Sequence, residues 1–594
     1  MAKEVVADSV TQFKVSRSKW VRVLAGPGAG KTYNIKERLM YLVKDAGVSP
    51  DQILVLSFTS VAAQDLRASI DKLGLGPIEV STLHSLALRI IEKEKKNIRL
   101  MSNFEKDTML RDLEPDIGII GSKQNKMKGL LLESDFSTND ISVKTFKDSL
   151  EKWKFQHPSL YLDDLIPYVC NLLEHNASAK KRSSFDCIIV DEYQDLNPNE
   201  QRFVELLLSK RGNLAVIGDD DQSIYGFKGA APTGIKEFVN THDGCEDIQF
   251  SLCWRCPTDI IKYANALIAN NDDRIEKTLE AKKGFQKGAC ELLSSETPNA
   301  EIERICQIVR EEIEHGVDPN EIVILTPIKD RGKKLYLAMN DNNIPTSFCF
   351  RDAVFDDEKT RENISLLSLA ANPRDLVSWR YLLGCGSKER KAKSYRYIRK
   401  YADSEHMNIL DVLEQCATGR IRVEYRYTRE LIKRYIEINN QLKAIEAHPQ
   451  WLIDSIKATD ESYASILESA FSEKFSMGGF EAVRRLVIDE LFSPEATAAN
   501  GKVRIMSLHA SKGLSANLVI IMSAVDGFIP SRKSSIAEQR RLFYVAITRC
   551  KGGEPGRHPG KVIISWYNHS EDLITDRQVT RFVSEMGYRP KEQT

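Results

Sequence analysis

The sequence lacks long apolar segments and an excess of charge of either sign. Its 594 residues contain no run of about 18 apolar residues, and the first twenty show no apolar stretch before a small-residue cleavage site. We therefore expect a cytoplasmic protein that is neither secreted nor membrane-spanning. Because 84 Lys and Arg balance 84 Asp and Glu, any nucleic acid would have to be bound by local basic patches.

Closely spaced cysteines are also scarce. The 11 cysteines are scattered from Cys170 to Cys550, which favours a reducing compartment over a disulfide framework. Cys253 and Cys256 have metal-ligand spacing, but no second such pair and no nearby pair of histidines would complete a tetrahedral zinc site. We favour ordinary packing for these two cysteines, with zinc binding as the alternative.

Strand-like and helix-like patterns alternate in two parts of the chain, which is too long for one small domain. Strands are expected at 20–24, 53–58, 187–190, 214–217, 321–325, 503–506, 518–522 and 562–566. Such alternation predicts an α/β fold with two parallel-sheet lobes, each interrupted by a mostly helical inserted subdomain. The expected boundaries are 1–92 with 185–250 for the first lobe, 251–374 with 501–594 for the second, and 93–184 and 375–500 for the insertions.

A glycine-rich turn follows the first expected strand. Residues 26–32 read GPGAGKT between a strand and a helix, so backbone N–H groups and the helix N-terminus would surround a polyphosphate. Lys31 would reach the β- and γ-phosphates, and the hydroxyl of Thr32 would bind Mg²⁺. The strict phosphate-loop pattern has glycine where this chain has Ala25, a difference of one small residue.

Paired acids follow a later apolar strand, in the segment FDCIIVDEYQD at 185–195. Asp191 at the strand tip is placed to hold Mg²⁺, and Glu192 to polarise an attacking water. Two adjacent acids alone are often just a solvated strand end. Beside a phosphate loop, the catalytic interpretation is favoured.

Eight motifs occur in the order typical of the UvrD/Rep-like superfamily 1 DNA helicases, which the chain resembles over most of its length. Beyond GPGAGKT and DEYQD they are LVLSFTSVAAQDLRASI (54–70), STLHSLAL (81–88), GDDDQSIYGFKGA (218–230), LCWRC (252–256), IMSLHASKGL (505–514) and EQRRLFYVAITR (538–549). The resemblance implies two RecA-like lobes with ATP and Mg²⁺ in the cleft between them. It also implies an ATP hydrolase that moves 3′→5′ on single-stranded DNA and unwinds duplex.

Position within these motifs assigns roles at the nucleotide. The family match implies a catalytic set of Lys31, Asp191, Glu192, Gln222, Arg255 and Arg549, with Thr32 and Asp191 as metal ligands. The nucleotide contacts that it implies are Gln12, Gly26, Pro27, Gly28, Ala29, Gly30, Lys31, Thr32, Tyr33, Trp254, Arg255 and Gly513. Gln12 would read the adenine and Trp254 would stack on it, while Gln194 would orient the water. For the two arginines, surface ion pairing is the alternative.

Aromatic and basic residues suggest the DNA track. Single strands are held by stacking and backbone contacts, and the family match implies Phe58, His84, Tyr225, Phe227, Lys228 and His509 for this role. The alternative is core packing for the aromatic rings and local hydrogen bonding for the histidines. In the second insertion, KERKAKSYRYIRKY at 388–401 suggests a patch facing a single/double-strand junction, with Lys388, Arg390 and Lys391 as its contacts. A solvated helix face is the alternative.

Several functions remain open at this point. The complete catalytic set favours a helicase of DNA repair, replication or recombination over a scaffold that binds DNA without hydrolysis. A translocase that displaces proteins, or the motor subunit of a repair or anti-phage defence complex with a nuclease partner, is the alternative. Ser515 stands where the family usually has a ribose-contacting Glu, and Lys228 replaces a common Arg. RNA is not excluded as the track, because stacking and phosphate contacts serve both polymers.

Overall fold

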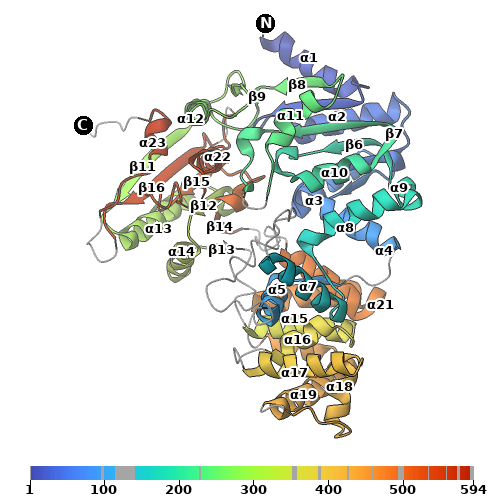
Figure 1. Ribbon diagram of the computed structural model, residues 1–594. Helices are drawn as coiled ribbons and strands as arrows, with labels where there is room; N and C mark the ends of the chain where they lie inside the picture. Colours follow the sequence, from blue (N-terminus) through green and yellow to red (C-terminus); the bar gives the residue numbers. More distant parts are fainter. Residues whose placement is uncertain are drawn as a thin grey trace. The chain divides into compact units, whose positions relative to one another are not determined.

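A computed structural model describes most of the chain as helices and strands (Figure 1). The described residues are 2–94, 99–113, 141–226, 229–350, 358–384, 390–424, 427–457, 461–492, 501–532, 534–554, 556, 558–570 and 576–588. Within these ranges, no helix combines the length and the apolar character that crossing a membrane requires. The chain divides into two compact units, one made of 1–90, 169–350 and 493–594, and the other of 91–168 and 351–492.

Two parallel six-stranded sheets form the framework of the first unit. The first sheet has the order β3-β2-β6-β7-β1-β8, with β1 (Trp20–Ala25), β2 (Ile53–Leu56), β3 (Glu79–Ser81), β6 (Phe185–Val190), β7 (Leu208–Gly218) and β8 (Glu246–Phe250). The second has the order β11-β16-β15-β12-β14-β13, with β11 (Ala289–Ser295), β12 (Ile322–Thr326), β13 (Thr346–Cys349), β14 (Val503–Ser507), β15 (Leu518–Ile521) and β16 (Lys561–Tyr567). We call the parts built on these sheets the first lobe and the second lobe. They confirm the predicted two-lobe α/β fold.

The central strands are apolar along their whole length because helices cover both faces of each sheet. All residues of β2 and β12 are buried, as expected for strands between two helical layers. The covering helices of the first lobe include α1 (Ala2–Val15), α2 (Lys31–Lys44), α3 (Ser60–Asp71), α10 (Pro198–Leu206) and α11 (Thr233–Thr241). Those of the second lobe include α12 (Thr258–Ile268), α13 (Pro298–Glu314), α14 (Lys329–Asp341) and α22 (Ile536–Ile547).

The polar motifs follow the carboxyl ends of neighbouring strands in the first sheet. The phosphate loop follows β1, the DEYQD acids follow β6, and GDDDQ begins at the end of β7, which lies between those two strands. In open parallel sheets, ligands bind outside the carboxyl ends of the strands. Sheet order therefore gathers motifs that are up to about two hundred residues apart in the sequence.

The second unit is mostly helical, as predicted for the insertions. Its helices are α5 (Asn103–Leu113), α7 (Ile141–Gln156), α15 (Glu358–Ala371), α16 (Leu376–Gly384), α17 (Arg390–Ser404), α18 (Ile409–Ala417), α19 (Thr428–Ala447), α20 (Gln450–Lys457) and α21 (Glu461–Phe492). A short parallel pair joins β4 (Leu100–Met101) to β5 (Leu160–Tyr161). The boundaries expected from the sequence for these insertions stay predictions.

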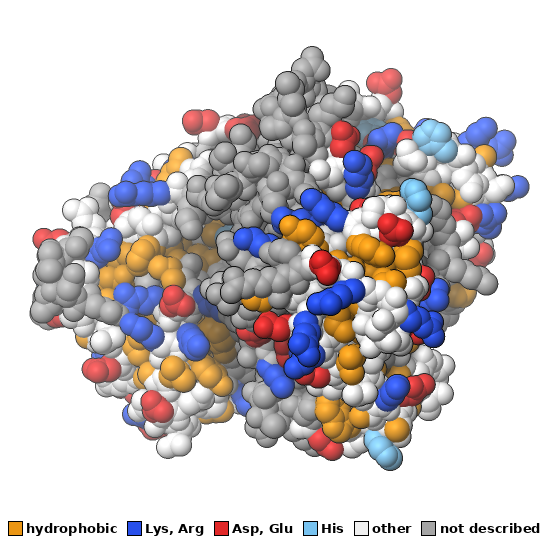
Figure 2. All heavy atoms as spheres, turned by 60° about the horizontal axis from the view of Figure 1, so that its bottom comes forward, with side chains coloured by type: hydrophobic (Ala, Val, Ile, Leu, Met, Phe, Trp, Pro, Cys, Tyr) orange, Lys and Arg blue, Asp and Glu red, His pale blue; other side chains and the backbone are white. Residues whose placement is uncertain are grey.

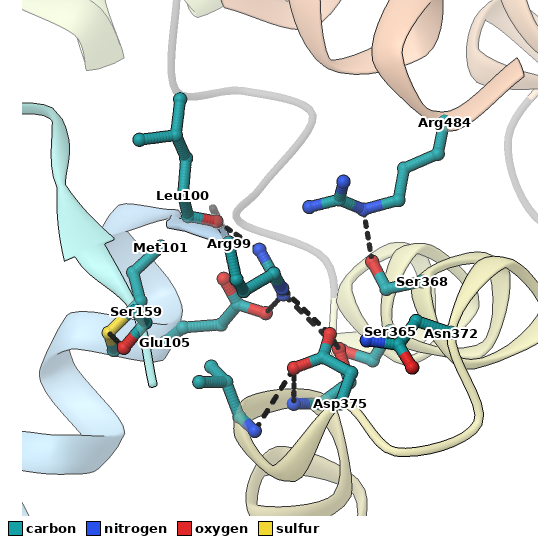
Figure 3. A network of polar contacts seen from close by, with 12 residues as sticks. Arg99, Leu100, Met101, Glu105, Ser159, Ser365, Ser368, Asn372, Asp375 and Arg484 are labelled. Carbon is teal, nitrogen blue, oxygen red and sulfur yellow. Dashed lines mark hydrogen bonds and ion pairs between the residues drawn. The ribbon is translucent and has the colours of Figure 1, made fainter. Parts of the chain in front are cut away.

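Buried ion pairs join the two stretches of chain in the second unit. Arg99 donates to Asp375 at 2.7 Å and also pairs with Glu105, as Figure 3 shows. Arg380 holds Asp112 with both branches of its guanidinium, which makes the pairing bidentate. These carboxylates are buried, so each needs its arginine to avoid an uncompensated charge. The two insertions therefore fold as one body.

Candidate nucleotide site

The phosphate loop turns sharply between β1 and α2, and glycine is required at its centre. Gly28 and Gly30 have φ angles of 70° and 77°, a region that side chains with a Cβ rarely adopt. A Cβ on Gly28 would also lie 2.7 Å from Cβ of Arg255. The carbonyl of Gly28 accepts a hydrogen bond from the N–H of Trp254 at 2.8 Å. The second lobe therefore contacts the loop directly.

The N-terminus of α2 offers the loop a site for an anion. Gly30 occupies the N-cap position and supplies no side-chain acceptor to the first turn of the helix. The first N–H groups of a helix lack intrahelical partners and carry the positive end of the helix dipole. Successive N–H groups at this position are the usual cradle for phosphate.

Lys31, the first residue of α2, lies against the paired acids that follow β6. Its Nζ forms an ion pair with Glu192 and lies 3.7 Å from Oδ1 of Asp191. Burial would lower the pKa of Lys31, but Glu192 and Asp191 outweigh burial and raise it. Burial would likewise raise the pKa of Glu192, yet Lys31 and Lys512 hold it below its usual range. Burial raises the pKa of Asp191. Glu192 is therefore an ionised carboxylate.

Glu192 has a strained backbone of the kind found at functional sites. Its φ of 57° and ψ of 39° lie in the left-handed region, which costs a residue with a Cβ about 1–3 kcal/mol. Gln194 fixes its side chain by donating from Nε2 to Oε2 of Glu192 at 2.7 Å. The other end of the same amide accepts the N–H of Asp219 at 3.0 Å. Gln194 thus links the DEYQD segment to GDDDQ.

Gln222 is held from two sides. Its Nε2 donates to Oδ2 of Asp219 at 2.9 Å, and its carbonyl accepts from Nζ of Lys512 at 2.7 Å. Lys512 comes from the second lobe and also pairs with Asp195. Burial raises the pKa of Asp195 to about 6 despite this pairing. Lys512 was not among the predicted site residues, although its position in the motif at 505–514 could have indicated this role.

The two arginines predicted to act from the second lobe differ in their contacts. Nε and Nη2 of Arg255 are buried without a hydrogen-bond partner among the described residues. Arg549 is bonded within its own lobe, donating to the carbonyls of Val545 at 2.9 Å and Leu514 at 3.3 Å. Burial and the nearby charge of Arg255 lower the pKa of Arg549 to about 9. Both side chains are therefore close to each other, and Arg255 has the unused donors.

The remaining residues predicted to contact the nucleotide differ in their exposure and in their contacts with the phosphate loop. Trp254 and Tyr33 are 50% and 61% exposed, so their rings are accessible to a ligand. Thr32 and Gly513 are also exposed. Gln12 has an exposed side chain in α1, and no described hydrogen bond joins it to the phosphate loop. The structure therefore brings together the residues predicted to bind phosphate and to catalyse hydrolysis.

These residues fit a nucleoside triphosphate with Mg²⁺. Buried guanidinium donors without a partner are costly unless an anion satisfies them, and Arg255 supplies two such donors beside the phosphate loop. The hydroxyl of Thr32 and the carboxylate of Asp191 are the hard oxygen ligands that Mg²⁺ takes alongside phosphate. The donor set thus matches the chemistry expected from the sequence.

The predicted DNA-contacting residues are only partly described. Phe58 and Tyr225 stack on each other, with ring centroids 5.0 Å apart, and Tyr225 is only 7% exposed. The hydroxyl of Tyr225 donates to the carbonyl of His509 at 3.4 Å. Nδ1 of His84 lies 3.9 Å from Glu200. Phe227, Lys228 and Lys388 lie outside the described residues. Arg390 and Lys391 belong to α17, but their side chains are not described.

Surface charge and the cysteine pair add two further observations. On the face shown in Figure 2, Lys and Arg side chains are interspersed with Asp and Glu, as the overall charge balance suggests. Cys253 and Cys256 are fully buried in the apolar core of the second lobe. Sγ of Cys253 lies beside the phosphate loop, since it would be 2.9 Å from a Cβ on Gly28.

Comparison with known proteins gives matches over most of the chain. The model of the UvrD/REP helicase N-terminal domain matches residues 9–159 and 121–243, and that of the UvrD-like helicase C-terminal domain matches 248–477 and 481–553. The ATP-dependent DNA helicase Rep of Buchnera aphidicola is 26% identical over 593 residues, which cover 89% of this chain and 91% of Rep. The ATP-dependent DNA helicase PcrA of Staphylococcus epidermidis is 27% identical over 591 residues, covering 89% of this chain and 80% of PcrA.

Proposed function

The chain belongs to the UvrD/Rep family of superfamily 1 helicases and is an ATP-hydrolysing DNA helicase; on this premise we propose that it moves 3′→5′ along single-stranded DNA and unwinds duplex at single/double-strand junctions. The direction rests on the family resemblance, and the observation that supports hydrolysis coupled to lobe closure is the meeting of groups from both lobes at one point. Lys31, Glu192 and Gln222 come from the first lobe, and Arg255 and Lys512 from the second.

Hydrolysis would begin with an exchange of partners at Lys31. When the triphosphate enters, Lys31 leaves Glu192 for the β- and γ-phosphates, and Glu192 becomes free to accept a proton from the attacking water. Gln194 keeps the carboxylate of Glu192 oriented during this exchange. Bound Mg²⁺, held through Thr32 and Asp191, supplies neutralisation of the phosphate charge.

Arg255 would stabilise the charge that develops on the transferred phosphoryl group. Phosphoryl transfer gains most from positioned cations, because its transition state spreads charge over the phosphoryl oxygens. The unsatisfied Nε and Nη2 of Arg255 support this role. Arg549 would join it after giving up its bonds to the carbonyls of Val545 and Leu514.

Coupling to DNA would run through the segment that contains both Gln222 and Tyr225. Gln222 is bonded to a residue of each lobe, so a change in lobe closure reaches it directly. Tyr225, three residues later, stacks on Phe58 and bonds to the backbone of His509. Each cycle of closure and opening would thereby shift the aromatic contacts along the strand.

Unwinding of tailed duplexes tests direction and activity together. The purified chain, with Mg²⁺ and ATP, should separate a duplex that carries a 3′ single-stranded tail and leave one with a 5′ tail intact, while Lys31→Ala separates neither. Preference for the 5′ tail would overturn the direction. Strong DNA-stimulated hydrolysis without strand separation would instead support a protein-displacing translocase, or a motor that opens duplex only with a partner subunit.

A further inference from the structure

A buried cluster of charges joins the two lobes behind Gln222. Three consecutive acids of the first lobe, Asp219, Asp220 and Asp221, which we call the acid triplet, are almost completely buried. Arg274 and Lys277 reach them from the loop of the second lobe that follows α12. No other group of the described residues was found with three carboxylate, thiol or imidazole ligand atoms close enough together to hold a metal ion.

Lys277 occupies the centre of the acid triplet. Its Nζ lies 3.0 Å from Oδ1 of Asp219 and 2.8 Å from Oδ2 of Asp221, and it also pairs with Asp220. Its side chain is only 8% exposed. Burial would lower the pKa of Lys277, but the three carboxylates raise it, so it is a cation. A protein ammonium group thus occupies the space between the three carboxylates.

One carboxylate of the triplet connects Lys277 to Gln222. Oδ1 of Asp219 faces Lys277 and also accepts the N–H of Asp221 at 3.1 Å, while Oδ2 accepts Nε2 of Gln222 at 2.9 Å. Because a carboxylate is a rigid planar group, the bonds to Oδ1 also restrict the position of Oδ2. One hydrogen of the Gln222 amide is thereby committed, which sets the direction of its second N–H and of its Oε1.

Arg274 stabilises the other side of the triplet. Its guanidinium holds Asp221 in a bidentate pair with distances of 3.0 and 2.6 Å. The backbone N–H of Ile275 donates to Oδ2 of Asp220 at 2.9 Å. Asp220 and Asp221 therefore keep partners from the second lobe even without Lys277. Among the described residues, Lys277 is the cation that forms an ion pair with Asp219, while Lys31 and Arg274 interact with this carboxylate electrostatically from farther away.

We propose that Lys277 is a positioning residue for ATP hydrolysis, because its ammonium holds Asp219 in the orientation that fixes the γ-phosphate-sensing amide of Gln222. This inference rests on the proposed function. Since Lys277 belongs to the second lobe and Gln222 to the first, the alignment of Gln222 depends on how the lobes sit against each other. Lys277 thereby makes the sensor responsive to lobe closure.

A double-mutant cycle with Gln222 tests this role. Lys277→Met should lower kcat of DNA-stimulated ATP hydrolysis about 10- to 100-fold, the usual order for a displaced catalytic group, with KM for ATP within about threefold. In a Gln222→Ala background, Lys277→Met should change kcat less than about twofold, because the group that it positions is already absent.

Lys236→Met is the matched control. Lys236 is also a lysine that pairs across the lobes, with Asp273, whose side chain is 84% exposed, and neither side chain bonds to Asp219 or Gln222 in the described part of the chain. We expect kcat within about twofold of the unsubstituted chain, as for most surface ion pairs. An equal loss in Lys236→Met and Lys277→Met would mean that any cross-lobe ion pair has this effect, and would overturn the proposal.

Further outcomes separate this inference from the proposed function. Suppose that the unsubstituted chain hydrolyses ATP. If Lys277→Met then has the same kcat, or if it lowers kcat by the same factor in the Gln222→Ala background as in the unsubstituted chain, the inference is wrong and the proposed function stands. If the unsubstituted chain is inactive with DNA, the function fails and the inference falls with it. Should Lys277→Met not fold, Asp219→Asn replaces it in the cycle with the same expected results.

Discussion

The ammonium of Lys31 is paired with the carboxylate of Glu192, so the phosphate-binding cation and the predicted base neutralise each other in the structure. A bound phosphate would share the three N–H donors of this ammonium group with Glu192, and its negative charge would weaken the ion pair. We therefore expect nucleotide entry to loosen the hold of Lys31 on Glu192.

Replacement of Glu192 by glutamine should separate binding from turnover. We expect Glu192→Gln to lower kcat by about 10²- to 10⁴-fold, the range for loss of a general base. Affinity for ATP should stay the same or increase, because Lys31 loses its competing partner. Equilibrium titration with a fluorescent ATP analogue and steady-state hydrolysis measure the two quantities. Glu237→Gln, an exposed site on α11, is the control, and unchanged hydrolysis in Glu192→Gln would refute the assignment.

Arg255 should be sensitive even to a conservative change. Arg255→Ala removes a cation from the phosphoryl group, and we expect kcat to fall by about 10³-fold or more. Arg255→Lys keeps the charge but loses the forked donors, so it should recover only part of this loss. Steady-state hydrolysis with saturating single-stranded DNA measures both. Full activity of Arg255→Lys would show that the two unsatisfied nitrogens have no specific ligand.

The stacked pair of Phe58 and Tyr225 should matter for DNA and not for basal hydrolysis. Phe58→Ala removes one ring of the pair, and loss of a base-stacking contact corresponds to about 1–3 kcal/mol, roughly 5- to 150-fold in affinity for single-stranded DNA. Hydrolysis without DNA should remain unchanged. The test compares the affinity of Phe58→Ala for a labelled oligothymidylate with that of Phe155→Ala. Phe155 lies in the second unit and its side chain is 88% exposed, so it serves as the control. Equal affinity in both variants would mean that the pair is only part of the core.

Acid should weaken the second unit through His157. This buried ring contacts the carbonyl of Trp153 at 3.0 Å and the hydroxyl of Tyr395 at 2.8 Å, and burial lowers its pKa to about 4. Between about pH 6.5 and 4, the unfolded chain binds a proton that the folded chain refuses, so stability is lost as pH falls. The full effect is about 3 kcal/mol.

Hydrogen exchange of α7 and α17 at pH 7 and pH 5 measures this loss. His157→Gln retains a polar side chain but cannot titrate, so its protection should fall less between the two pH values than that of the unsubstituted chain. If both proteins lost protection equally, other groups would account for the acid sensitivity.

The architecture could be predicted because its determinants are local. The apolar runs of β2 and β12 and the GPGAGKT turn specify strands and a phosphate loop without reference to distant residues. Motif order then implied which segments meet at the nucleotide. The pairing of Lys31 with Glu192 could not be predicted in this way, because it depends on the sheet order, in which β1 and β6 both flank β7 and end at the same edge.

Contacts between charged residues in loops could not be predicted in this way. Lys277 lies in no motif, and nothing in its neighbours indicates that it meets Asp219, which is 58 positions earlier in the chain. The side-chain direction of Arg549 was equally inaccessible, since its place in the turn after α22 does not determine whether the guanidinium points to Leu514 or to a ligand. Such details depend on how two separate sheets are packed together.

Steady-state ATP hydrolysis by the purified chain, with and without single-stranded DNA and beside Lys31→Ala, tests the central claim most directly. The account predicts slow hydrolysis alone, strong stimulation by single-stranded DNA, and neither in Lys31→Ala. Hydrolysis that stays negligible with DNA, or stimulation that persists in Lys31→Ala, would contradict it.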